Sequence, residues 1–208
     1  LAWRYGDPEA HALRAAIAAH HGVGPGNIML GEGIDGLLGY LARMMIVPGT
    51  PVVTSLGTYP TFNYHVLGFG GVLRAVPYRD DATAPEALLA AARETAAPLV
   101  YLANPDNPMG GWHSAAAVSA LIDGLPEDAL LCLDEAYADF APPEAVPPLD
   151  VAETRVIRMR TFSKAHGLAG ARIGYAIGHA DLIAAFDRVR NHFGLGTVAQ
   201  AGALAAIS

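Results

Sequence analysis

The sequence predicts an α/β protein in which a mostly parallel β-sheet is sandwiched between helices, giving three layers. Short apolar segments typical of strands alternate along the chain with longer segments of helical periodicity. Residues 99–103 and 130–133 are apolar almost throughout, as is typical of strands buried on both faces. Helices between consecutive strands imply right-handed crossovers, which place those strands in parallel.

The individual elements follow from local signals. Asp7 and Pro8 predict the start of a helix over residues 8–21, and Gly22 predicts its end. Further helices are expected at residues 34–46, 60–69, 85–96, 114–123, 180–191 and 198–207. Strands are expected at residues 27–30, 51–55, 72–76, 99–103, 130–133, 156–159 and 173–177. Residues 141–148 are rich in proline and predict a loop.

Composition narrows the possible partners of the 208-residue chain. Its formal net charge is −7 and it has no basic tract, so neither nucleic acid nor a membrane surface is an expected partner. The single cysteine, Cys132, cannot form an internal disulfide and favours a cytoplasmic location. The eight histidines form no metal-ligand motif, so no metal site is expected. The chain begins without methionine and ends in a helical pattern, which predicts an excerpt of a longer protein.

A glycine-rich motif predicts a phosphate site. Residues 31–36, Gly-Glu-Gly-Ile-Asp-Gly, match G-x-G-x-x-G between an expected strand and an expected helix. Glycines let a phosphate approach the backbone, and the helix N-terminus favours its negative charge. A dinucleotide site also needs an acidic residue about 20 positions further on, but no Asp or Glu lies between Asp35 and Asp80. The motif therefore favours a phosphate cradle for another cofactor over an NAD site.

The only lysine, Lys164, lies in Thr161-Phe162-Ser163-Lys164, after an expected strand and eight residues before Arg172. Hydroxyl groups and a guanidinium suit a phosphate dianion. A lysine in an apolar setting can act as a nucleophile in Schiff-base chemistry. An ordinary surface lysine explains this segment equally well.

Two polar clusters follow buried strands at the carboxyl edge of the predicted sheet, where ligands bind in such folds. Residues 104–110, Asn-Pro-Asp-Asn-Pro-Met-Gly, follow one strand, and Asp134 ends another. Each cluster alone is compatible with a plain loop or a helix cap. Combined with Lys164, they predict one site.

Taken together, these motifs resemble the fold-type I pyridoxal-phosphate enzymes of the class I/II aminotransferases, and among them the histidinol-phosphate aminotransferase branch. The resemblance runs from Trp3 to the last helix. It implies that Lys164 forms a Schiff base with pyridoxal 5'-phosphate and that Asp134 pairs with the pyridinium nitrogen. It also implies that Tyr137 and Asn107 donate to the phenolic oxygen of the cofactor.

The resemblance assigns further cofactor contacts. Phe62 is expected to stack on the cofactor ring. Tyr5 is expected to reach the phosphate in a neighbouring subunit, which implies a homodimer with shared active sites. The expected phosphate cup consists of Thr161, Arg172 and the backbone of Ile34 and Asp35. Ser163 is expected near this cup, and Gly33 is a further expected cofactor contact.

The implied activity is transamination between an amino acid, or an amino-acid-like phosphate ester, and a 2-oxo acid, with Lys164, Asp134 and Tyr137 as catalytic residues. Residues 1–208 would form the cofactor-binding large domain, with an N-terminal arm and a smaller domain outside this sequence. Alternatives are a decarboxylase of a phosphorylated amino acid on the same scaffold, a non-catalytic cofactor-binding regulatory domain, and a nucleotide-binding oxidoreductase. Gly36 and Met109 depart from the residues common in the family.

Overall fold

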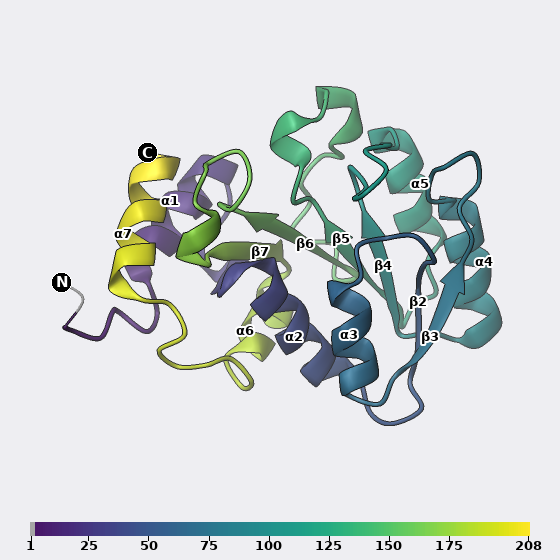
Figure 1. Cartoon of the computed structure of the whole chain (residues 1–208), viewed down its shortest axis with the longest axis horizontal. Helices are drawn as coiled ribbons and strands as arrows, with labels where there is room; N and C mark the ends of the chain where they lie inside the picture. The colour runs from purple at the N-terminus through teal and green to yellow at the C-terminus, as the bar shows by residue number, and fades with distance from the viewer. Residues whose placement is uncertain (1–2) are drawn as a thin grey trace.

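Within residues 3–208, the part of the chain that the computed structural model describes, seven strands form one sheet. Its strand order is β1-β7-β6-β5-β4-β2-β3 (Figure 1). The strands span Ile28–Gly31 (β1), Pro51–Ser55 (β2), Val72–Val76 (β3), Leu99–Ala103 (β4), Leu130–Asp134 (β5), Val156–Thr161 (β6) and Gly174–Gly178 (β7). All seven predicted strands are present, and their ends lie within two residues of the predicted ones.

One strand of the sheet, β7, runs against the others. Strands β2 to β6 pair in parallel. β7 pairs antiparallel with both β6 and β1, so β1 points the same way as the parallel strands. The helices α2, α3, α4 and α5 carry the chain back to the end of the sheet at which the parallel strands begin, before β2, β3, β4 and β5 respectively. Connections between parallel strands require such a return. The predicted mostly parallel sheet is confirmed.

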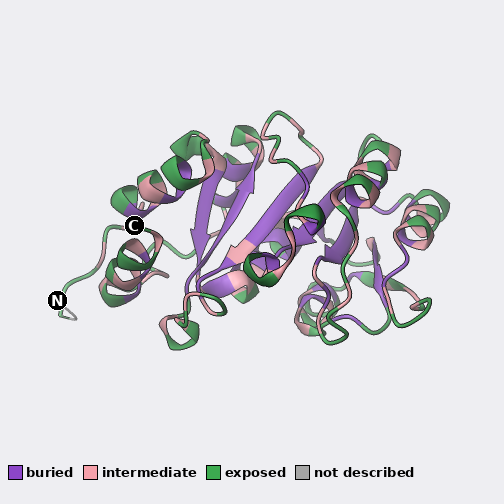
Figure 2. Ribbon diagram, turned by 90° about the horizontal axis from the view of Figure 1, so that it is seen from above, coloured by how far each residue is buried: buried purple, intermediate pink, exposed green. Residues whose placement is uncertain are grey.

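Helices cover both faces of the sheet. Alternate strand residues enter different cores: Met29 and Cys132 pack under α2, α3 and α6, whereas Ile28 and Leu131 face the layer of α1, α4, α5 and α7. Figure 2 shows the buried strands between helices with exposed outer sides. The helices described are α1 (His11–His21), α2 (Gly33–Met45), α3 (Thr61–Gly68), α4 (Pro85–Thr95), α5 (Ala115–Gly124), α6 (Ala180–Phe186), α7 (Thr197–Ile207) and the short 3-10 helices η1 (Pro25–Asn27), η2 (Ala138–Phe140), η3 (Pro143–Ala145) and η4 (Ala169–Ala171).

The first helix begins three residues later than predicted. Asp7 does act as a cap, because its carboxylate accepts the backbone N–H groups of Glu9 at 3.0 Å and His11 at 2.9 Å. Ala10, however, has a φ of 46°, in the left-handed region. A left-handed residue interrupts a right-handed helix, so residues 8–10 form a turn and α1 begins at His11.

The sixth helix is shorter than predicted and ends at Phe186. The backbone N–H groups of residues 187–189 bond to carbonyls three positions earlier, which tightens the chain into turns. Arg190 then turns toward the N-terminal segment, where it donates to the Pro8 carbonyl at 2.9 Å and binds the Glu9 carboxylate. This long-range contact is not visible in the local pattern of the sequence.

Residues 3–208 contain neither a helix that could span a membrane nor a cluster of side chains that could hold a metal ion. No helix there combines the length and the apolar character needed to cross a lipid bilayer. No group of three or more His, Cys, Asp and Glu side chains in the same part of the chain could hold a metal ion.

Candidate active site

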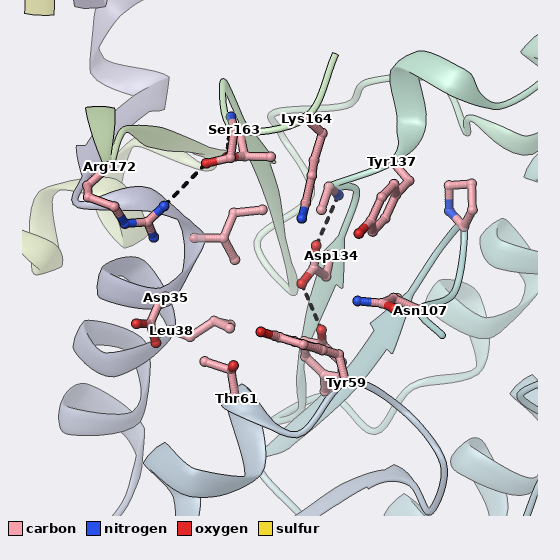
Figure 3. A pocket seen from close by; sticks show the side chains of 16 residues that line it. Asp35, Leu38, Tyr59, Thr61, Asn107, Asp134, Tyr137, Ser163, Lys164 and Arg172 are labelled. Atoms are coloured by element: carbon pink, nitrogen blue, oxygen red, sulfur yellow. Dashed lines mark hydrogen bonds between the residues drawn. The ribbon is translucent and has the colours of Figure 1, made fainter. Parts of the chain in front are cut away.

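A cavity of about 250 Å³ lies at the edge of the sheet where β4, β5 and β6 end (Figure 3). The start of α2 and the loop before β7 close it from the side of β1. Nine of the predicted site residues line this cavity: Ile34, Asp35, Asn107, Asp134, Tyr137, Thr161, Ser163, Lys164 and Arg172. They come from five separate stretches of the chain, and the folded sheet brings them together.

Asp134 is a buried carboxyl at the end of β5. Its Oδ2 accepts the Tyr101 hydroxyl at 2.7 Å, and its Oδ1 accepts the Ala136 backbone N–H at 3.0 Å. Burial raises the pKa of Asp134, while these two hydrogen bonds act in the opposite direction. A cationic group bound in the cavity would therefore favour the ionised form of this carboxyl.

Lys164 follows β6 and projects into the cavity. Figure 3 shows its ammonium group directed toward Asp134 and beside Tyr137. The Nζ atom lies 5.2 Å from the centre of the Tyr137 ring. Tyr137 itself precedes η2, directly after β5, so two neighbouring strand ends place the amine and the phenol together.

The other end of the cavity is suited to an anion. The guanidinium of Arg172 donates to Ser163 Oγ at 3.4 Å and to the Ala169 carbonyl at 3.0 Å. Ile34 lines the cavity in the first turn of α2, where backbone N–H groups have no partner within the helix. A guanidinium, a hydroxyl and a helix N-terminus together form a binding site for a phosphate group.

Glycines bring Arg172 and α2 into contact. Gly33 has a φ of 76°, and a Cβ at this position would lie 2.5 Å from Arg172 Nη2. A Cβ at Gly174 would lie 3.0 Å from the backbone of Gly33 and Ile34. Side chains at these two positions would separate α2 from β7 and displace the guanidinium. Gly33, a predicted cofactor contact, lies beside the anion end of the cavity but does not line it.

Buried polar contacts shape the loop that carries Asn107. The Asn104 side chain accepts the His113 backbone N–H at 2.8 Å and donates to the Ala145 carbonyl at 2.9 Å. The Asp106 carboxylate accepts the Tyr78 hydroxyl at 2.6 Å. Tyr78 was not predicted as a partner of this loop, because 28 residues separate it from Asp106 and no local motif joins them.

Comparison with known proteins shows which family shares these features. The family model described as aminotransferase class I and II matches residues 2–208. The chain belongs to this family. A curated histidinol-phosphate aminotransferase of Mesorhizobium japonicum is 40% identical over 98% of this chain and 57% of its own length.

Solved structures agree with this assignment. A histidinol-phosphate aminotransferase from Sinorhizobium meliloti, solved in complex with pyridoxal-5'-phosphate, has a TM-score of 0.97 and 56% identity over 99% of this chain and 56% of that one. An L-threonine-O-3-phosphate decarboxylase from Porphyromonas gingivalis has a TM-score of 0.85 over 99% of this chain and 64% of that one. At 20% identity, the decarboxylase shares the fold alone. The chain spans little more than half the length of the curated relatives it matches.

In this member of the class I and II aminotransferases, the placement of Phe62 contradicts the prediction that it stacks on a bound ring. Phe62 points from α3 into the core, has no exposed surface, and stacks on Tyr101 with ring centres 4.5 Å apart. Tyr59, two residues before α3, lines the cavity instead (Figure 3). The segment Tyr59-Pro-Thr-Phe62 contains two aromatic residues, either of which could stack on a ring. The rotation of α3 decides which of the two faces the cavity.

Tyr5 lies outside the cavity. The residue is 84% exposed, and its ring packs on Phe193 with ring centres 4.7 Å apart. A single chain does not test a contact with a neighbouring subunit, so that role of Tyr5 stays a prediction. The cavity is also lined by Leu38, Thr61, Tyr101, Ala103, Pro105 and Ala136, of which only Pro105 belongs to a polar cluster predicted from the sequence.

Proposed function

We propose that residues 1–208 form the pyridoxal 5'-phosphate-binding large domain of an aminotransferase. The enzyme transfers an amino group between an amino acid, or an amino-acid-like phosphate ester, and a 2-oxo acid. The observation that carries this proposal is the convergence of Lys164, Asp134 and Arg172 on one cavity. Membership of the class I and II aminotransferases and the cofactor in the Sinorhizobium relative support it.

The donor set of the cavity fits this cofactor. Arg172, Ser163 and the first turn of α2 match a phosphate dianion. The buried Asp134 carboxyl, with its raised pKa, matches a cationic ring nitrogen. When bound, pyridoxal 5'-phosphate supplies an electron sink for the electron pair left by a bond broken at the amino carbon of the substrate.

Each catalytic residue has a defined task. Lys164, the only lysine, would hold the cofactor and, once the substrate amine has released it, would move a proton from the substrate Cα to C4′ of the cofactor through its Nζ atom. Asp134 would keep the ring nitrogen protonated, and the Tyr101 hydroxyl fixes the orientation of its carboxylate at 2.7 Å. The phenol of Tyr137 beside Nζ would orient the amine.

The names of the curated relatives support one amino donor as the candidate to test. Histidinol phosphate is the amino donor that we propose to test first, because the curated relatives are named for it. Decarboxylation of a phosphorylated amino acid is not favoured, because the Porphyromonas decarboxylase shares only its fold with this chain.

We also propose a cytoplasmic homodimer. The exposed Tyr5 supports the dimer, because its phenol is free to contact a second copy. The free, buried thiol of Cys132 supports a reducing compartment. Tyr5→Phe in a dimeric enzyme should weaken cofactor binding, and an unchanged dissociation constant would contradict this role.

The decisive test is covalent labelling of the full-length protein. Addition of pyridoxal 5'-phosphate should produce a visible absorption band, and reduction with borohydride followed by peptide mapping should place the label on Lys164. The Lys164→Ala variant should lose both the band and the label. A wild-type protein without a band would overturn the proposal.

A further inference from the structure

Asp35 places a negative charge at the end of the cavity that suits an anion. It lies in the first turn of α2 and lines the cavity. A carboxylate in the first turn of a helix is attracted to the same free N–H groups that bind a phosphate. Asp35 would therefore compete with the ligand unless another residue held its side chain elsewhere.

The imidazole of His65 on α3 provides such a hold. His65 Nε2 lies 2.8 Å from Asp35 Oδ1. Within residues 3–208, this is the one hydrogen bond that the Asp35 carboxylate makes. In Figure 3 the carboxylate of Asp35 points away from Lys164 and the centre of the cavity.

The contact depends on the absence of a side chain at Gly39. Asp35 and Gly39 are four residues apart, so they lie on the same face of α2. A Cβ at Gly39 would lie 3.0 Å from Cε1 and 3.2 Å from Nδ1 of the His65 ring. The imidazole thus lies against the backbone of α2, in a space that a larger residue would fill.

We propose that His65 is a positioning residue for the phosphate end of the cavity. By holding Asp35, it keeps the carboxylate off the first amides of α2 and leaves those amides and Arg172 to a phosphate monoester. This inference rests on the proposed function and deepens it, because it concerns how the same site selects a phosphorylated cofactor.

Two variants that differ by one methylene test the proposal. The amide of Gln reaches the position of the imidazole Nε2, so His65→Gln should preserve the contact with Asp35. The amide of Asn reaches only the position of Nδ1, so His65→Asn should lose it. Absorbance titration of the full-length protein gives dissociation constants for pyridoxal 5'-phosphate and for pyridoxal, which lacks the phosphate.

We expect His65→Asn to weaken binding of pyridoxal 5'-phosphate about threefold to tenfold, the scale of one charge near a helix terminus. Binding of pyridoxal should not change, and His65→Gln should behave as wild type for both ligands. In an Asp35→Asn background the loss should shrink, because the competing charge is absent.

Equal weakening for the two ligands, or equal losses in the Gln and Asn variants, would show a merely structural role and overturn the inference alone. A wild-type protein that binds neither ligand would overturn the proposed function together with this inference. Circular dichroism of each variant confirms that the compared proteins are folded.

Discussion

Replacing Gly33 with alanine tests whether the start of α2 and Arg172 form one anion site. Gly33 has a φ of 76°, and a Cβ there would lie 2.5 Å from Arg172 Nη2. The left-handed conformation costs a residue with a Cβ about 1–2 kcal/mol, which lowers Tm by roughly 2–8 °C for a chain of this size. A displaced guanidinium loses a charged hydrogen bond worth about 1.5–3 kcal/mol, so binding of pyridoxal 5'-phosphate should weaken roughly tenfold to a hundredfold.

Gly22 offers the matched control. Its φ is 68°, but a Cβ there would meet no atom within 4 Å. Gly22→Ala therefore has the same backbone cost without touching Arg172. Thermal unfolding should show similar losses of Tm in the two variants, whereas absorbance titration should show weaker cofactor binding only in Gly33→Ala. Equal cofactor affinity in the two variants would refute the role of Gly33 at the anion site.

Three ionisable groups, the buried Glu135 and Asp134 and the half-buried His21, give further expectations. Glu135→Gln removes the carboxylate that pairs with the buried Arg158 and the half-buried Arg160, and should lower the free energy of unfolding, measured in urea, by about 3–5 kcal/mol. Glu86→Gln, which breaks the exposed pair with Arg79, should change it by less than about 1 kcal/mol. Burial lowers the pKa of His21 from 6.5 to about 4. The free energy of unfolding should therefore fall as the pH drops through this range, by about 1–2 kcal/mol after solvent screening. Thermal unfolding of the His21→Gln variant should lack this loss. Burial raises the pKa of Asp134, so stability without cofactor falls as the pH rises above 3.8. At pH 7, Asp134→Asn should therefore raise the Tm of the cofactor-free protein and impair catalysis; a lower Tm would contradict this account.

Local sequence signals were sufficient for most of the cavity. Lys164, Asp134 and Asn107 each lie within a few residues of the end of an apolar strand, and a parallel sheet places all such ends at one edge. Their convergence therefore follows from strand order in the chain and does not require knowledge of tertiary contacts. The antiparallel exception, β7, was not assigned from the sequence.

Features that depend on tertiary packing were not predictable in the same way. The orientation of α3 decides whether Phe62 or Tyr59 faces the cavity, and that orientation depends on contacts with the sheet. The pairing of His65 with Asp35 joins residues 30 positions apart and depends on the missing side chain of Gly39. No periodicity within a single segment reports such a contact.

The direction of β7 explains why one short loop can supply both the amine and the guanidinium. β6 ends at Thr161 and β7 begins at Gly174, and because the two strands are antiparallel, both points lie at the same edge of the sheet. Lys164 near the start of the loop and Arg172 near its end therefore line one cavity. A parallel β7 would require a crossover to the opposite edge and would carry Arg172 away from the first turn of α2. The single reversed strand is thus what joins the anion end of the cavity to the lysine.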